Sequence, residues 1–189
     1  MNTNKSSKII VNLALVAAAA VAVIGSGLDR VSATEISNQK IIELTNKERD
    51  LRGLEPLRID SSLCRAANLK SGNMLALNYF DHFAHGLSPW VIIQNSGYDY
   101  QYAGENLAMD FVTSEGVVNA WMQSQDHRKN ILNPNFEDVC IGVASGKYSD
   151  TDGQIRNTTM VTQMLGKKKP VILSIASEIL YRVFGITTR

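Results

Sequence analysis

The spacing of apolar residues predicts amphipathic helices in the part of the chain that follows residue 36. Apolar side chains recur at Ile41, Leu44 and Leu51 with charged residues between them, which gives a helix one buried stripe. Asp60 is a typical N-cap, and Pro89 follows a serine at the first position where a helix tolerates proline. The predicted helices cover residues 37–51, 60–77 and 88–97, and a further helix opens at residues 113–114.

Nearer the C-terminus, helical spacing gives way to strand-forming composition. Residues 139–148 and 158–165 are rich in Val, Ile, Thr and Tyr, and residues 149–153 between them are turn-forming. This order predicts an antiparallel hairpin. Helices followed by strands indicate an α+β protein in which helices pack on a sheet.

The N-terminal segment, residues 1–34, has the pattern of an export signal. Lys5 and Lys8 precede an apolar run of about 20 residues that ends before Asp29. A run of this length suits a cleaved signal peptide and equally an uncleaved membrane anchor. In both cases the lysines favour a cytoplasmic N-terminus. The domain at residues 35–166 is therefore expected outside the cytoplasm, either secreted or anchored to the cell membrane.

Residues 167–189 are predicted to form a basic linker followed by an amphipathic helix. The linker contains the run Lys167, Lys168 and Lys169. Between residues 171 and 186 the polar side chains fall at steps of three and four, so a helix gathers them into one stripe. About 16 residues is short for a membrane span. The helix is expected to lie on a membrane surface, on the domain itself or on a partner chain.

Composition narrows the classes of function. The chain has 19 basic and 18 acidic residues and a formal net charge of +1, so a nucleic-acid partner is not expected. Cys64 and Cys140 are expected to form a disulfide if the domain is exported, and two buried free thiols are the alternative. A zinc site made by the cysteines is not expected, because they lack CxxC spacing.

Four short motifs follow one another between residues 80 and 143. They are FDH at 80–82, GENLA at 104–108, WMQSQDHRKNIL at 121–132 and IGV at 141–143. In this order and spacing they resemble the bacterial branch of the CAP superfamily, whose SCP domains occur in cysteine-rich secretory, antigen 5 and pathogenesis-related-1 proteins. LTNKER at 44–49 and VTQMLG at 161–166 resemble the family's first helix and last strand. The resemblance covers nearly all of residues 36–166.

The resemblance implies an α-β-α sandwich, with a central antiparallel sheet flanked by helices. It also implies an open cleft where histidines and acidic residues meet. Carried over to this sequence, the cleft residues are His82, Glu105 and His127, with His85 and Asp126 as further candidates. Plant and animal members usually have a second glutamate three residues after the tryptophan that Trp121 matches; here that residue is Ser124. Three family residues, rather than four, are therefore expected in the cleft.

Several chemistries are open to such a cluster. His82 and His127, with one carboxylate, can bind zinc or another divalent metal and leave a position free. Imidazoles can also transfer protons near neutral pH. The sequence contains neither an HExxH helix nor a GxSxG motif, so it shows no recognisable nucleophile. Trp121 is expected in the core, and Arg128 and Asn130 are expected to tie down the loop after its helix.

These observations predict an extracytoplasmic binding module that requires no cofactor. Its ligand is expected to be a divalent metal, a small apolar molecule, a glycan or another protein. The alternative is a metal-dependent, peptidase-like hydrolase at the cell envelope, with Glu105, His82 and His127 as catalytic candidates. A third hypothesis is a membrane-surface adaptor driven by the C-terminal helix. The expected partners are the membrane, through the two terminal segments, and an unidentified extracellular ligand.

Overall fold

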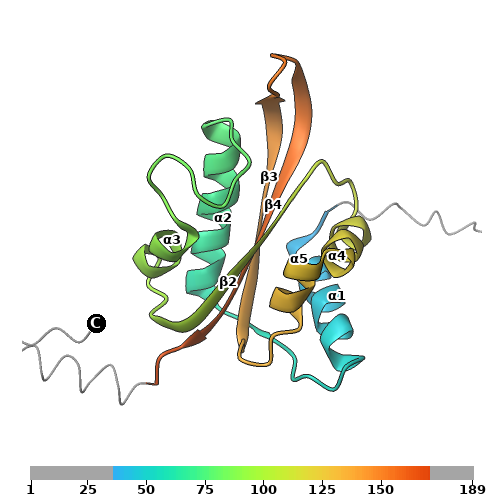
Figure 1. The fold of residues 1–189 in the computed structure, drawn as a ribbon, viewed down its shortest axis with the longest axis vertical. Coiled ribbons are helices and arrows are strands. Elements are labelled where there is room, and N and C mark those ends of the chain that lie inside the picture. Colours follow the sequence, from blue (N-terminus) through green and yellow to red (C-terminus); the bar gives the residue numbers. More distant parts are fainter. Residues whose placement is uncertain (1–35, 171–189) are drawn as a thin grey trace, which may run out of the picture. The chain divides into compact units, whose positions relative to one another are not determined.

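The computed structural model describes residues 36–170, in which helices cover both faces of one sheet. The helices are α1 (Asn38–Asp50), α2 (Ser61–Ala76), α3 (Pro89–Asn95), α4 (Ser114–Gln123) and α5 (Gln125–Ile131). The strands are β1 (Arg58–Ile59), β2 (Tyr100–Met109), β3 (Asp138–Ser149) and β4 (Ile155–Lys168). Helices α2 and α3 lie on one side of the sheet, and α1, α4 and α5 lie on the other (Figure 1). This arrangement confirms the predicted α-β-α sandwich.

The strand order β1-β3-β4-β2 leaves β2 at one edge of the sheet. Strands β3 and β4 form the predicted antiparallel hairpin, and β4 also pairs antiparallel with β2. The short strand β1 joins β3 in parallel, so the sheet is antiparallel except at this edge.

Polar caps begin the predicted helices where the sequence indicated. The Ser37 hydroxyl accepts a hydrogen bond from the Lys40 amide, and the Asp60 carboxylate accepts from two amides of the first turn of α2. Ser88 and Thr113 cap α3 and α4 in the same way. Each cap satisfies an amide that the helix leaves unpaired, which fixes the start of the helix. The four predicted helices are confirmed.

Strands β1 and β2 and helix α5 were not predicted from the sequence. Strand β2 has a continuous buried stretch rather than alternating exposure, and polar residues interrupt it. Helix α5 buries only Ile131, so it has no apolar stripe that spacing could detect. The segment after α4, where a loop tied down by Arg128 and Asn130 was expected, therefore forms a helix that contains both residues.

Separate apolar cores fill the two faces of the sheet. Trp121 is 1% exposed, and its indole N–H donates to the Leu107 carbonyl oxygen at 2.9 Å, which confirms it as a core residue. On the opposite face, Cys64 of α2 and Cys140 of β3 form a disulfide. A covalent link here joins the helix that precedes the His82 loop directly to the sheet.

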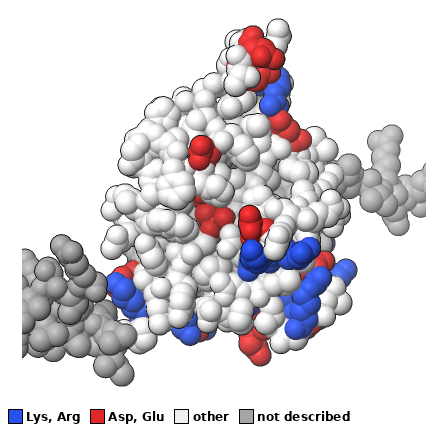
Figure 2. All heavy atoms as spheres, in the orientation of Figure 1, with Lys and Arg blue, Asp and Glu red and all other residues white. Residues whose placement is uncertain are grey.

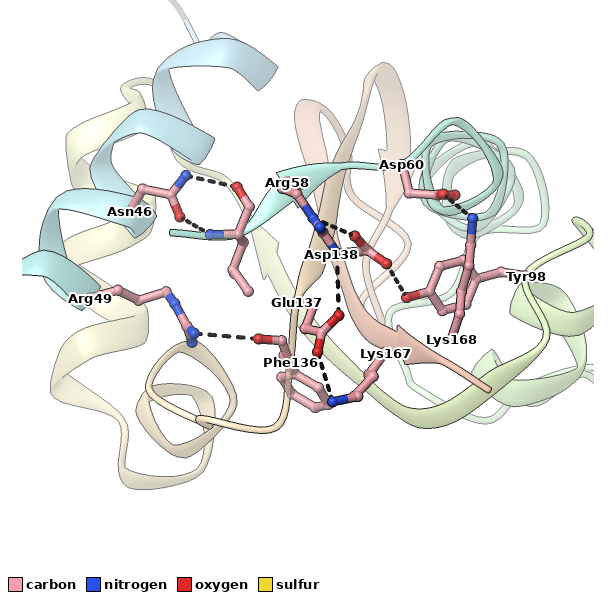
Figure 3. Close-up of polar contacts among 11 residues, drawn as sticks. Asn46, Arg49, Arg58, Asp60, Tyr98, Phe136, Glu137, Asp138, Lys167 and Lys168 are labelled. Carbon is pink, nitrogen blue, oxygen red and sulfur yellow. Dashed lines mark hydrogen bonds and ion pairs between the residues drawn. The ribbon is translucent and has the colours of Figure 1, made fainter. Parts of the chain in front are cut away.

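The lysine run at the end of the domain is tied to acidic side chains. Lys167 Nζ lies 2.7 Å from Glu137, Lys168 Nζ lies 2.6 Å from Asp60, and Lys169 Nζ lies 2.8 Å from Asp99 (the first two in Figure 3). Since β4 extends to Lys168, the domain end predicted at residue 166 falls inside this strand. Basic and acidic side chains are also interspersed along the lower edge of the face in Figure 2.

The N-terminal segment 1–34 and the C-terminal helix predicted at 171–186 lie outside the described residues. Between residues 36 and 170, no helix is both long and apolar enough to cross a membrane.

Candidate functional site

The centre of the candidate site is a contact between Glu105 and His82. Glu105 lies in β2, and His82 lies in the loop between α2 and α3. His82 Nδ1 is 2.6 Å from Glu105 Oε1. The Glu105 side chain is 1% exposed, whereas that of His82 is 43% exposed. The pair therefore joins a buried carboxylate to an imidazole that solvent and ligands can reach.

A pocket of about 250 Å³ opens at this contact. Its lining residues are His82, Phe83, Pro89, Trp90, Ala103, Gly104, Glu105 and Asn130. The lining combines aromatic and aliphatic surface with one buried acid, which is typical of sites for small molecules or chain segments.

The second carboxylate oxygen of Glu105 is the most unusual atom of the pocket. Oε2 is buried and has no hydrogen-bond partner among residues 36–170. A buried acceptor left without a donor costs about 1–3 kcal/mol, and more when it is charged. A ligand or a water molecule that donates to Oε2 would recover this cost.

Lys70 holds the loop that carries His82. The Lys70 side chain lies in α2, and the residue is fully buried. Its Nζ donates to the carbonyl oxygens of Asp81 at 2.6 Å and His82 at 2.9 Å, and it lies 5.0 Å from the centre of the Tyr79 ring. Burial lowers the pKa of Lys70, while the charges of Glu105 and Asp81 raise it. The lysine thus fixes the backbone from which His82 reaches Glu105.

A buried amide network fixes the other side of the pocket. Asn130 Nδ2 of α5 donates to the Glu105 carbonyl oxygen at 3.0 Å and to Asn106 Oδ1 at 2.8 Å. Asn106 Nδ2 in turn donates to the His127 carbonyl oxygen at 3.1 Å and to Gln163 Oε1 at 2.9 Å. The asparagine of the GEN motif therefore links β2 to α5 and β4 rather than lining the pocket.

The other predicted cleft residues lie outside this pocket. His85 lines a neighbouring hollow of about 350 Å³, and its ring centre is 5.1 Å from that of Tyr79. The Asp126 side chain is 90% exposed and pairs with Lys129 at 3.3 Å. His127 lies near enough to His82 for their charges to interact, but it does not line the pocket.

The metal site remains a prediction, and the described side chains alone do not provide a full set of ligands for it. Residues 36–170 contain no group of three or more His, Cys, Asp and Glu side chains that could hold a metal ion. Oε1 of Glu105 and Nδ1 of His82 are also already bonded to each other. We therefore derive no chemical step through a metal.

His127 is expected to make stability depend on pH. Burial lowers the pKa of His127, the His82 charge lowers it further, and Asp126 partly opposes both. Because the folded-state pKa is below the unfolded value, the unfolded chain binds the proton more readily. His127 thus contributes stability that is present above about pH 6.5 and lost as the pH falls towards its folded pKa.

We expect His127→Gln to flatten the decrease in stability on acidification below about pH 6.5. Urea unfolding of the wild type and the variant, measured across this range, checks the expectation. Parallel stability curves for the two proteins would show that the His127 proton is not linked to folding.

The fold and the candidate site lie in a region that matches a known protein family. The model of the CAP family, described as the cysteine-rich secretory protein family, matches residues 42–164, and this region is more than half of the chain. The chain belongs to this family. The family resemblance of the motifs is thereby confirmed, and His82, Glu105 and His127 all lie in the matched region.

Two relatives from Bacillus subtilis (strain 168) have similar sequences. "Uncharacterized protein YkwD" is 48% identical over 118 residues, which are 61% of this CAP-family chain and 46% of the relative. "Uncharacterized membrane protein YlbC" is 32% identical over 114 residues, which are 60% of this chain and 33% of the relative. The match therefore spans less than half the length of each relative.

Two solved structures are similar to the CAP-family fold described above. An extracellular protein containing an SCP domain from Bacillus anthracis str. Ames has a TM-score of 0.59 and 29% identity, covering 69% of this chain and 40% of that one. An outer surface protein from Borrelia burgdorferi has a TM-score of 0.57 and 21% identity, covering 72% of this chain and 99% of that one. The second likeness concerns the fold alone.

Proposed function

We propose that this CAP-family chain is a binding module whose ligand occupies the pocket at Glu105 and His82. The observation that carries the proposal is the buried Oε2 of Glu105, which has no donor among the described residues. Its environment favours a ligand with two features: a hydrogen-bond donor for Oε2, and an apolar part that contacts Trp90 and Phe83. Glycans, small apolar molecules with a polar group and segments of another protein can all have these features.

The pocket chemistry favours binding over hydrolysis. His82 and Glu105 could exchange a proton, but the pocket lining contains no Ser, Thr, Cys or Lys side chain that could attack a substrate. We therefore keep metal-dependent hydrolysis as the alternative and require no cofactor for the proposed function.

We propose that the module works outside the cytoplasm. Three observations support this location: the export-type pattern of residues 1–34, the Cys64–Cys140 disulfide, and the similarity to a protein described as extracellular. Anchoring to the membrane through residues 1–34 is part of the proposal. A membrane contact through the C-terminal helix gains little from Lys167, Lys168 and Lys169, because these lysines are already paired with acidic side chains.

Replacement of Glu105 tests the proposed function. The full chain is screened by ligand-observed NMR against glycan oligomers and hydroxylated apolar molecules, and the affinity of each hit is measured by calorimetry. We expect Glu105→Gln to weaken binding by roughly 10- to 100-fold, because a hydrogen bond to a charged group contributes about 1.5–3 kcal/mol.

Glu43→Gln is the matched control, since Glu43 is an exposed glutamate of α1 whose only ion-pair partner within residues 36–170 is Lys40. It is expected to leave the affinity unchanged. Hits whose affinity is insensitive to Glu105→Gln would place the ligand elsewhere and contradict the proposal.

A further inference from the structure

The pocket lies against the outer edge of the sheet. Strand β2 pairs with β4 on one side only, so its other edge faces no strand between residues 36 and 170. Strand edges present unpaired N–H and C=O groups, which can pair with a further strand. The direction of the backbone groups along β2 decides which residues could do so.

The hydrogen bonds between β2 and β4 show which way the backbone groups of β2 point. The Asp110 amide donates to the Thr159 carbonyl oxygen at 3.1 Å, so this even-numbered residue turns its N–H towards β4. In an antiparallel ladder, alternate residues turn their N–H and C=O groups to the same side. The register between β2 and β4 is regular from Tyr102 to Met109, so the odd-numbered residues there turn their backbone groups outward.

Two side-chain contacts agree with this assignment. The outward carbonyl oxygen of Glu105 accepts from Asn130 Nδ2 at 3.0 Å, and that of Leu107 accepts from Trp121 Nε1 at 2.9 Å. Two outward carbonyl oxygens of β2 thus already accept hydrogen bonds from side chains of α4 and α5.

The next stretch of this edge is open. Among the described contacts, neither the N–H and C=O of Ala103 nor the N–H of Glu105 has a partner on its outer side. Ala103, Gly104 and Glu105 line the pocket, and Glu105 also carries the unpaired Oε2. One wall of the pocket therefore has hydrogen-bonding groups at strand spacing.

We propose that the ligand is an extended peptide that adds a strand to the outer edge of β2 at Ala103–Glu105. This inference rests on the proposed function and names its ligand class. Peptide addition to a sheet edge obtains affinity from main-chain hydrogen bonds and specificity from pockets for alternate side chains. Here the pocket beside the edge receives one such side chain.

The chemistry of the pocket selects a lysine-type side chain. Its alkyl stem lies against the apolar surface of Phe83, Pro89 and Trp90, and its ammonium donates to Glu105 Oε2. Glu105 offers a negative charge to the ammonium, and the pocket lining contains no Lys or Arg. The buried Lys70 also interacts with the charge of Glu105, but its ammonium is bound to the carbonyl oxygens of Asp81 and His82. Long basic side chains commonly combine an apolar stem with a charged end in this way.

The probe for the experiment is a phage-displayed library of random 12-residue peptides, selected on the immobilised full chain. Selected peptides are synthesised with a methyl group on one backbone nitrogen at a time. We expect methylation to weaken binding at least about tenfold at the one residue whose amide donates to the open Ala103 carbonyl oxygen, and to change it little at the two neighbouring residues, whose amides face away from β2. Acetylation of the peptide's lysine is expected to cause a loss of the same order.

The protein side is tested with a matched pair of variants. Ala103→Pro removes the outward N–H, and an edge strand tolerates proline at such a position. It is expected to weaken peptide binding at least about tenfold, and by more than Ala103→Ser, which keeps the N–H. If Ala103→Pro proves unstable in thermal unfolding, the N-methylated peptides decide the question alone.

Two outcomes would overturn the inference. Equal losses on methylation of neighbouring peptide residues would exclude strand addition, as would an unaffected affinity in a stably folded Ala103→Pro. A third outcome distinguishes the peptide inference from the proposed binding function. If no peptide is selected, but a glycan binds and Glu105→Gln abolishes that binding, the peptide inference fails and the proposed function stands.

Discussion

Replacement of Arg49 by methionine is expected to lower the free energy of unfolding by about 3–5 kcal/mol. Arg49 is 1% exposed, and its guanidinium donates to four backbone carbonyl oxygens. These belong to Glu55, Ile131, Asn133 and Phe136, the last of which is shown in Figure 3. Methionine preserves much of the side chain's length and leaves these carbonyls without their donor. Urea unfolding followed by tryptophan fluorescence measures the loss.

Arg52→Met is the control for this experiment. Arg52 lies just after α1 and pairs with Glu48 at 2.8 Å on an exposed part of the surface. Exposed ion pairs contribute about 0–1 kcal/mol, so this variant is expected to lose no more than that. Similar losses for the two variants would show that the buried carbonyl contacts of Arg49 do not determine stability.

Arg49 also connects the stability of the fold to the pocket. Its contacts with Ile131 and Asn133 hold the end of α5, the helix whose Asn130 binds the Glu105 carbonyl oxygen. Loosening this end of α5 would weaken the hydrogen bond from Asn130 to the Glu105 carbonyl oxygen, one of the two side-chain contacts at the outer edge of β2. The LTNKER motif, in which Arg49 stands, therefore supports the site from the other face of the sheet.

The helices that the sequence predicted are those that bury one face against the sheet and expose the other. Helices α1 and α2 present one stripe to the sheet, and capping residues define their starts, so spacing alone found them. It did not find β2, because this strand is buried along a continuous stretch that includes Glu105 and Asn106. Polar residues in a buried strand remove the apolar pattern by which a strand is predicted. In β2 these polar residues form the site and its supporting network.

Lys70 shows a signal that the sequence did contain. It falls on the inner stripe of α2, three residues after Ala67 and four before Met74, where an apolar residue is expected. A lysine at such a position is buried only if partners accept its hydrogens, and the carbonyls of Asp81 and His82 do so. Long basic residues on an apolar stripe therefore indicate a structured neighbouring loop.

The separation of His82 from His85 could not be predicted in this way. The two histidines are three residues apart in a loop, where neither helical nor strand periodicity fixes side-chain direction. His85 has a φ of 53° and Gly86 a φ of 74°, so the backbone turns between the pocket at Glu105 and the neighbouring hollow. Family motifs identified His82 correctly as a neighbour of Glu105, while proximity in sequence suggested His85 without a geometric reason.

The second large effect is expected from Gly142→Ala. A Cβ atom at Gly142 would lie 2.2 Å from the backbone carbonyl carbon and oxygen of Ala67 in α2. Helix backbone cannot move aside as the end of a side chain can, so α2 must shift away from β3. Overpacking of this kind costs about 1–3 kcal/mol and occasionally more, and the rigid neighbour favours the upper part of that range. Urea unfolding of the variant measures it.

The matched control is Gly146→Ala in the same strand. A Cβ there would lie 2.9 Å from Leu75 Cδ2, the end of a flexible side chain that can rotate away, so a smaller loss is expected. The two variants also differ in their consequence for the site. A shift of α2 at Ala67 displaces Lys70 one turn further along and, with it, the carbonyl contacts that hold His82 beside Glu105. We therefore expect Gly142→Ala, but not Gly146→Ala, to change the NMR signals of the His82 ring. Unchanged His82 signals in a destabilised Gly142→Ala would show that the packing of α2 does not determine the position of His82 in the pocket.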